Sequence, residues 1–234
     1  MKTIENYWIR CNTEGGHIME DGFYDIPHGV ATEFLLPRHY SGRKPNICFS
    51  YGSYVNGVLK AVCTFGIPAS PYLCSGLAGK NNSKHVIELN RLCRENDYNK
   101  PLSQFVSWCL KKLKTLNIYV VSFSDTDMNH HGYIYQACNF YYTGKTKQRT
   151  DKYTEGNRHA RHYKEEQQNG MRKVRSSKYR YVYICAESKA KKREMLKEMN
   201  YPIIKEYPKG NNSKDYELGY VLKQKIVSKK KEDM

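Results

Sequence analysis

The sequence predicts an α/β domain built on a mixed, mostly antiparallel sheet flanked by helices. Residues 47–66 form two apolar runs around Asn56 and Gly57, and this dipeptide is the strongest short-range signal for a β-hairpin. After Pro101, apolar residues recur at intervals of three and four, the period of an amphipathic helix. The order of hairpin, strand, helix, strand, helix, strand, basic insert and strand then indicates a single mixed sheet.

The helix after Pro101 is the clearest element. Its apolar face consists of Leu102, Phe105, Val106, Cys109, Leu110 and Leu113. Lysines near its end suit the negative pole of the helix dipole. Other apolar runs predict strands at 118–124, 140–145 and 179–186, and a lysine-rich helix at 189–199.

Other segments carry weaker patterns. A short helix over 132–138 is expected to end at Asn139, with Asp127 or Asn129 as its cap. A helical turn near residues 31–36 is stopped by Pro37. Residues 69–83 indicate a loop, and the first 30 residues are irregular, which suggests a helix or a loop near the surface.

The segment HVIELNRLC, residues 85–93, is the strand that follows the hairpin. Strict alternation places Ile87, Leu89, Arg91 and Cys93 on one face and Val86, Glu88, Asn90 and Leu92 on the other. Each face is then partly polar. This is unusual for a strand buried on both sides, unless its polar members line a pocket.

The charge favours polyanionic partners. The 234 residues carry a formal net charge of +16 and include 21 tyrosines, so cations can displace counterions from phosphate while aromatic faces stack on bases. Nucleic acid is therefore the leading partner, and a solvated surface with a disordered basic tail is the alternative. No apolar run is long enough to span a membrane and the start lacks a signal peptide, so we expect a cytoplasmic protein.

The eight cysteines are spread along the chain with no CxxC pair. In a cytoplasmic chain this spacing indicates reduced, mostly buried thiols. A structural zinc site is not expected.

A polar cluster follows the apolar strand that begins at residue 118. It contains Ser124, Asp125, Asp127, His130 and His131. A strand end that meets a helix start can hold polar groups rigidly and still expose them, so this is the first candidate site. Asp127 with His130 and His131 is a weaker candidate for a metal such as iron, because adjacent histidines point apart and no helical H-x-x-x-H supports them.

Several separated motifs resemble a known family. The stretch IYQACNFYYTG resembles the Y-x-x-x-G-F-x-x-x-G passage in the fourth helix and following strand of GNAT-type acyltransferases, with Asn139 replacing glycine at the left-handed helix end. Together with HYSGRKPN, FGIPASPYLC, IELNRLC and VSFSDTD, it is similar to the phage Mom family over roughly residues 35–150. The resemblance implies a GNAT-like fold and transfer of a carbamoylmethyl or an acyl-type group to the N6 amine of adenine, which protects phage DNA from host restriction.

The chemistry suggests roles for two residues of this region. The exocyclic amine of adenine is a poor nucleophile, so a carboxylate that accepts its proton assists the attack, and Asp125 beside Ser124 is the candidate. The family resemblance places Tyr135 where its hydroxyl protonates the leaving group. The alternatives are a helix cap for Asp125 and core packing for Tyr135.

Two further groups are candidates for binding donor or substrate. The first, on the strand at 85–93, consists of Glu88, Asn90 and Arg91. The second is a loop suited to a DNA strand or a flipped base, and consists of His39, Tyr40 and Ser41 with the DNA-binding cations Arg43 and Lys44. A surface salt-bridge set and a solvated loop are the respective alternatives.

We divide the chain into a GNAT-like modification domain at 1–185 and a basic C-terminal helix and tail at 186–234. The domain contains a basic insert at 145–177. We expect the phosphates of double-stranded DNA to contact its cations, namely Lys147, Arg149, Arg158, Arg161, Arg172, Lys173 and Arg175.

The donor is expected to be an activated acyl or aminoacyl group. GNAT acetyltransferases hold the pyrophosphate of CoA on a glycine-rich loop, but the corresponding segment here, RENDYNKPLSQ, has no glycine. A CoA thioester and an aminoacyl-tRNA therefore both stay open as donors. A protein N-acetyltransferase acting on a host factor, and a non-catalytic nucleic-acid-binding protein, are the alternative functions.

Overall fold

The computed structural model describes residues 20–153, 171–210 and 225–228. Its strands are β1 (Gly22–Asp25), β2 (Phe49–Val55), β3 (Val58–Gly66), β4 (Val86–Arg94), β5 (Ile118–Asp125), β6 (Tyr141–Lys145), β7 (Arg149–Lys152), β8 (Met171–Arg175), β9 (Lys178–Cys185) and β10 (Ile226–Ser228). Its helices are α1 (His28–Leu35), α2 (Pro71–Asn82), α3 (Leu102–Lys112), α4 (Tyr133–Ala137) and α5 (Lys189–Glu198), with 3₁₀ turns η2 (Ser83–His85), η3 (Lys114–Leu116) and η4 (Thr126–Met128).

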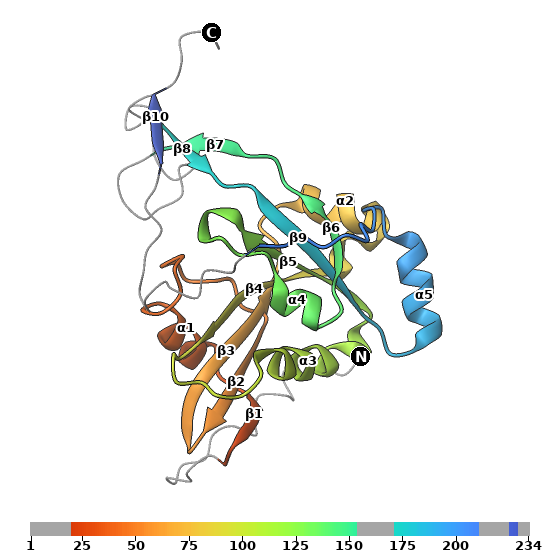
Figure 1. Ribbon diagram of the computed structural model, residues 1–234. Coiled ribbons are helices and arrows are strands. Elements are labelled where there is room, and N and C mark those ends of the chain that lie inside the picture. Colours follow the sequence, from red (N-terminus) through yellow and green to blue (C-terminus); the bar gives the residue numbers. More distant parts are fainter. Residues whose placement is uncertain (1–19, 154–170, 211–224, 229–234) are drawn as a thin grey trace.

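Seven strands form the main sheet in the order β1-β2-β3-β4-β5-β9-β6 (Figure 1). Only β4 and β5 are parallel within it, and all the other neighbours are antiparallel. The predicted fold class, a GNAT-like α/β domain with a mixed and mostly antiparallel sheet, is confirmed.

The parallel strands β4 and β5 separate early. Their pairing covers Val86–Glu88 against Tyr119–Val121, whereas β4 continues to Arg94 and β5 to Asp125. Just beyond the last pair, Ser122 Oγ donates to the Leu89 carbonyl at 2.9 Å. We call the point where pairing ends, at Glu88 and Val121, the fork.

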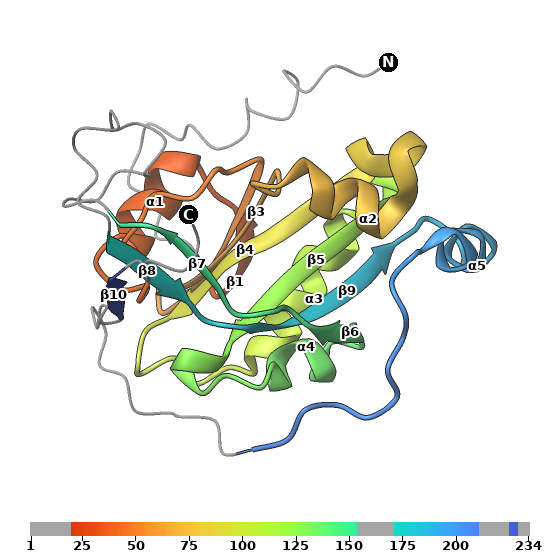
Figure 2. The same cartoon turned by 90° about the horizontal axis from the view of Figure 1, so that it is seen from above.

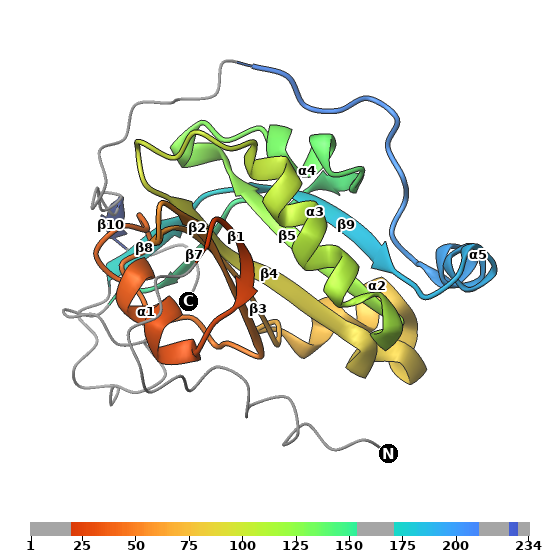
Figure 3. The same cartoon turned by 90° about the horizontal axis from the view of Figure 1, so that it is seen from below.

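Each face of the main sheet has its own helices. α3 and α4 cover the face that carries Phe65, Leu89, Val120 and Tyr181. The other face holds α1 near β3 and α2 with α5 near β5 and β9, as the two opposite views show (Figures 2 and 3). A side chain of the sheet therefore packs against α3 and α4 on one face, or against α1, α2 and α5 on the other.

A bulge in β4 corrects the predicted alternation. The pairing of β3 with β4 shifts between Thr64 and Phe65, so Thr64 opposes Arg91 while Phe65 opposes Leu89. One extra residue in a strand reverses the facing of every residue beyond it. Cys93 consequently packs beneath α1 instead of joining Leu89 in the α3 core. The bulge brings Arg91 to the same face as Glu88, contrary to the prediction.

Two segments differ from their predictions. The supposed loop at 69–83 contains α2, which begins with Pro71 at its first position and buries Cys74, Leu77 and Ala78. Proline at the first helical position and this apolar spacing were the available signals. Within the irregular first 30 residues, Gly22–Asp25 pairs with β2 as an edge strand.

Several local predictions are confirmed. Asn56 and Gly57 both have positive φ, at 52° and 73°, as a two-residue hairpin turn requires. Asn139 takes the left-handed conformation after α4, with φ 60°. The helix at α1 ends before Pro37. The caps expected for α4 are wrong, because Gly132 precedes that helix and makes no side-chain cap.

The basic insert supplies two strands of a second, three-stranded sheet, and β10 supplies the third. β7 pairs with β8 and β8 with β10, so β8 leads into β9 and carries this ribbon beyond the main sheet (Figure 1). After α5 the chain returns along the main sheet, where Ile204 N donates to the Tyr142 carbonyl at 2.9 Å and Tyr207 Oη to the Phe140 carbonyl at 2.9 Å. The cysteines of the described chain are free, and all but Cys48 are buried, as predicted.

A glycine at the end of β3 tests the close packing beside the fork. A Cβ at Gly66 lies 1.8 Å from the Asn46 carbonyl oxygen and 2.8 Å from Asn90 Nδ2. We expect Gly66→Ala to lower the free energy of unfolding by roughly 1–3 kcal/mol, because backbone must move. Gly29→Ala is the matched control, since a Cβ there meets nothing within 4 Å and alanine favours helix α1 by up to about 1 kcal/mol. If both variants have the same free energy of unfolding in urea, the close packing around Gly66 is contradicted.

Candidate active site

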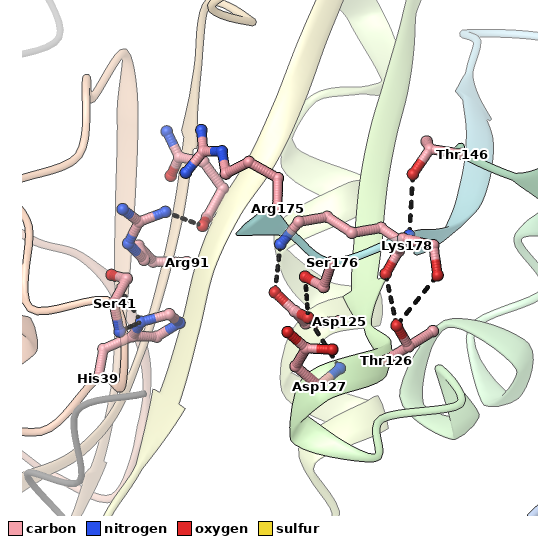
Figure 4. Close-up of polar contacts among 12 residues, drawn as sticks. His39, Ser41, Arg91, Asp125, Thr126, Asp127, Thr146, Arg175, Ser176 and Lys178 are labelled. Atoms are coloured by element: carbon pink, nitrogen blue, oxygen red, sulfur yellow. Dashed lines mark hydrogen bonds and ion pairs between the residues drawn. The ribbon is translucent and has the colours of Figure 1, made fainter. Parts of the chain in front are cut away.

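Asp125 ends β5 and is held by three donors. Lys178, its register partner on β9, forms an ion pair with Oδ2. Ser176 Oγ donates to Oδ1 at 2.6 Å, and the Asp127 amide donates to the same oxygen at 3.1 Å (Figure 4). The carboxylate is therefore both the cap of η4 and the anchor of a lysine.

The pKa of Asp125 lies below its usual value. Burial alone raises it, but the charge of Lys178 and the hydrogen bonds from Lys178, Ser176 and the Asp127 amide outweigh burial. Asp125 is thus a stable anion near neutral pH. A carboxylate stabilised in this way is a weak proton acceptor.

The polar side chains of β4 lie on the face shared by α1 and α2. Asn90 accepts from Thr64 Oγ1 at 2.6 Å and donates to the Asn46 carbonyl at 2.6 Å, which fixes it structurally. Arg91 donates to the Asn90 carbonyl at 2.6 Å and to the Arg43 carbonyl at 3.5 Å. Its Nε is buried without a hydrogen-bond partner in the described chain.

The loop after α1 presents a neutral histidine. Ser41 N donates to His39 Nδ1 at 3.2 Å, so the ring proton of the neutral form is on Nε2. Burial, with Arg91, His130 and Lys178 nearby, lowers the pKa of His39 to about 3. His39 stacks on Tyr40 at 4.4 Å between ring centroids, and Tyr40 meets His130 edge-on at 5.9 Å.

These groups come from four separate elements and converge beside the fork. Lys178 on β9 lies close enough to influence the pKa of both His39 and Glu88, and Arg91 influences the same two groups. Figure 4 shows Lys178 and Arg175 extending from the β8–β9 side toward β4, where Arg91 lies. The structure therefore brings together His39, Tyr40, Ser41, Glu88, Asn90, Arg91, Asp125 and Lys178.

Tyr135 and Ser124 face the opposite side of the sheet. Tyr135 is buried among the α3 and α4 core, and its hydroxyl hydrogen-bonds to Ser122, which itself donates to Leu89 at the fork. Burial raises the pKa of Tyr135 to about 12, so it holds its proton at neutral pH. Ser124 lies against Gly132, with its hydroxyl unpartnered in the described structure, and is not grouped with Asp125.

The two adjacent histidines diverge. His130 contacts Tyr40, whereas His131 stacks near Tyr133 and Tyr179 at 6.3 and 5.9 Å between centroids. Among the described residues, no group of three histidine, cysteine or acidic side chains is placed to hold a metal ion. Asp127 is exposed and joins neither histidine in such a group.

Several of the cations expected to contact DNA lie on the β7–β8 ribbon or on the loop after α1. In the pairing of β7 with β8, Arg149 lies opposite Arg175 and Asp151 lies opposite Lys173. Burial, Arg43 and Arg175 lower the pKa of Lys173, which shows that the ribbon faces the α1 loop. Arg172 binds Thr150 on the ribbon, Lys44 and Lys147 are exposed, and Arg158 and Arg161 lie outside the described residues.

Sequence reasoning missed Lys178 and Ser176 as members of the site. Both follow the basic stretch MRKVR, so they read as part of a DNA-binding insert. The available signal was their position at or just before the start of a predicted strand. Only the register of β9 against β5 puts Lys178 opposite Asp125.

The connection between β4 and α3 carries carboxylates rather than glycines. Glu95 pairs with Arg38 at 2.7 Å and Asp97 with Lys60 at 2.6 Å. Pro101 precedes the helix and provides no side-chain cap. Two carboxylates and a proline do not fit a pyrophosphate, which needs free amides and a positive field.

The sheet order, the parted parallel strands and the tyrosine at the fork define a GNAT-like acyltransferase fold. Solved structures with a similar arrangement include an N-acetyltransferase from Staphylococcus aureus Mu50, with 12% identity and TM-score 0.44 over 71% of this chain and 99% of that one. Another is the IAA acetyltransferase from Bacillus cereus ATCC 14579, with 13% identity and TM-score 0.44 over 70% and 99%. Likenesses this distant say nothing of a substrate.

A family comparison is more specific. The Mom protein family matches residues 22–209, and the chain belongs to that family. No curated protein matches the chain. Within the described ranges, no helix has the length and apolar character needed to cross a membrane.

The Asp125–Lys178 pair leads to a prediction about stability. Lys178→Met leaves a buried carboxylate without its cation, so we expect a loss of roughly 1–3 kcal/mol at pH 7. Acidification should reduce the difference in unfolding free energy from wild type, because without Lys178 the pKa of Asp125 is higher than in wild type and this carboxylate is neutralised first. Urea unfolding at several pH values measures this.

Lys60→Met is the control, since it removes a more exposed ion pair with Asp97. We expect almost no change in that variant at any pH. If the difference in the free energy of unfolding between Lys178→Met and wild type stays constant down to pH 4, the prediction is wrong.

Proposed function

We propose that this protein modifies double-stranded phage DNA by transferring a carbamoylmethyl or an acyl-type group to the N6 amine of adenine, which protects the DNA from host restriction. The observation that carries the proposal is the convergence of His39, Glu88, Arg91, Asp125 and Lys178 beside the fork of a Mom-family fold. The net charge of +16 supports a polyanionic substrate.

Adenine N6 needs assistance because its lone pair is drawn into the ring. Attack on the carbon of the group being transferred becomes easier when a base takes the amine proton and an acid protonates the leaving group. Tyr135 is suited to the second task, since it is protonated at neutral pH and hydrogen-bonds to Ser122 at the fork. A base inside a duplex must first be flipped out, and Tyr40, which stacks on the buried His39, offers an aromatic ring for it.

The donor belongs to the class of activated acyl or aminoacyl groups. Glu95 and Asp97 on the β4–α3 connection disfavour a CoA pyrophosphate at that point. An aminoacyl-tRNA, whose phosphates can bind elsewhere on a basic surface, is the second donor in this class. Supplying each donor separately to the purified protein with DNA distinguishes them.

Two other functions share part of this support. A protein N-acetyltransferase shares the fold, and a non-catalytic DNA-binding protein shares the charge. Mass spectrometry of nucleosides from DNA of expressing cells separates the three. Added mass on deoxyadenosine supports our proposal, acylated protein with unmodified DNA supports the acetyltransferase, and neither modification supports plain binding.

A tyrosine pair tests the proposed acid. Tyr135→Phe keeps the ring and removes the hydroxyl, so we expect modified deoxyadenosine to form roughly 10²–10⁴-fold more slowly. Tyr142→Phe is the matched control, because Tyr142 is equally buried in the same core and should keep full activity. Timed nucleoside mass spectrometry gives both rates, and equal rates for the two variants refute a role for the Tyr135 hydroxyl.

The ribbon cations lead to a prediction about DNA affinity. Replacing Arg149 and Lys173 by glutamine should weaken binding to all sequences alike and lower the salt dependence of log affinity by about two units. Lys111 and Lys114, exposed at the end of α3 and after it, are the control pair of equal charge. Titrations at several salt concentrations decide, and an unchanged slope removes the ribbon from the DNA site.

A further inference from the structure

The two most exposed large apolar side chains of the described chain lie on one short segment. Tyr72 is 87% exposed and Ile67 is 62% exposed. Both belong to residues 67–72, which run from the end of β3 into the first turn of α2 and which we call the β3–α2 loop. Single exposed apolar residues are ordinary on a protein surface, but the two most exposed ones on the same loop indicate a partner.

The β3–α2 loop adjoins the candidate active site. β3 ends at Gly66, whose register partner on β4 is Glu88 at the fork. A Cβ on Gly66 lies 2.8 Å from Nδ2 of Asn90, another member of the site. Just past the loop, burial raises the pKa of the Cys74 thiol, and the charge of Glu88 acts in the same direction. The loop therefore begins and ends beside the fork.

The backbone of this loop is held in place. Pro68 is buried, and Pro71 occupies the first position of α2. Leu73 N donates to the Ser70 carbonyl at 3.1 Å. Because proline fixes φ and the turn is hydrogen-bonded, the loop loses little conformational freedom when its side chains meet a partner. A rigid backbone of this kind suits a side chain that is inserted into its partner.

The ring of Tyr72 lies on the outer side of α2. The helix buries Cys74, Leu77 and Ala78 against the sheet, and successive helical residues are rotated by about 100° around the axis. Position 72 then falls opposite the buried side. Figure 2 shows α1, α2 and the β7–β8 ribbon around β4 and β5. A duplex bound by the cations of the α1 loop and the ribbon meets Tyr72 at the edge of the same face.

Base flipping creates a need that such a side chain can meet. An adenine that rotates out of a duplex loses its stacking on both neighbours and leaves its partner base unpaired. Proteins that distort DNA commonly insert an apolar side chain at the disrupted base step. A tyrosine ring can stack on any neighbouring base, whatever the sequence.

Building on the proposed function, we propose that the β3–α2 loop is a DNA wedge, whose Tyr72 ring enters the base stack and fills the space that the target adenine leaves as it rotates into the site beside the fork. Ile67, which directly follows the β3 residue paired with Glu88, packs against the adjoining base step. Tyr72 acts on the duplex and takes no part in the transfer of the group.

The test replaces the target adenine by 2-aminopurine, whose fluorescence is quenched by stacking inside a duplex. Neither donor nor group transfer is needed, so duplexes with every combination of neighbouring bases can be titrated with the purified protein. Wild type should raise the fluorescence of the duplexes that it distorts. Tyr72→Ala should lower the ratio of flipped to stacked base roughly 10–100-fold, the loss expected for one base–aromatic stack.

Two further variants are the controls. Tyr72→Phe keeps the ring and should behave as wild type. Val58→Ala shortens another exposed apolar side chain, 53% exposed at the opposite end of β3, and should also keep the signal. All three variants should melt at the wild-type temperature, because each change is at the surface. Equal fluorescence for Tyr72→Ala and wild type overturns the inference, and so does a wild type that raises no fluorescence in any duplex.

A duplex with an abasic site opposite 2-aminopurine distinguishes a wedge from a residue that only lines the site. The base pair is already lost there, so Tyr72→Ala should regain most of the wild-type signal, and a deficit as large as on the paired duplex overturns the wedge. Mass spectrometry of deoxyadenosine from expressing cells tests the proposed function separately. Added mass without any 2-aminopurine signal removes the wedge alone, whereas a signal that depends on Tyr72 without added mass supports the wedge and removes the proposed function.

Discussion

The site depends on the short pairing of β4 with β5, which covers only three residue pairs. Strands that stop pairing expose backbone groups that need other partners. Ser122 satisfies one of them by donating to the Leu89 carbonyl, and it also hydrogen-bonds to Tyr135. The parting of the strands thus supplies the opening in the hydrogen-bonded sheet and places a protonated tyrosine beside it. A sheet paired along its full length would separate Tyr135 from the groups on the other face.

A single bulge determines which side chains share this opening. Without the shift between Thr64 and Phe65, Arg91 would face the α3 core, where its guanidinium would be buried without a counter-ion. The bulge turns it toward Glu88 and the loop after α1, where it donates to the Arg43 carbonyl. Bulges of this kind often re-aim a side chain next to an active site. Here one extra residue joins the polar half of β4 to the loop that carries His39.

The electrostatics of the region are those of a surface built for an anion. Arg43 and Arg175 lower the pKa of Lys173, and Arg91 with Lys178 helps keep His39 neutral. Cations held close to one another weaken the isolated fold, and a bound polyanion offsets that cost. Such an arrangement agrees with the proposed DNA substrate. It also explains why the anchored carboxylate of Asp125 is needed, since Lys178 would otherwise add to the repulsion.

The sequence by itself determined the elements with strong periods. The hairpin at Asn56 and Gly57, helix α3 and the strands β5, β6 and β9 follow from local patterns, and the family resemblance came from motifs in one order. Local patterns also located Asp125, at the end of an apolar run. Tertiary structure alone decided the bulge in β4 and the pairing of Lys178 with Asp125. These features arise from register between strands distant in the chain, and a shift of one residue in register changes every contact without changing local propensity.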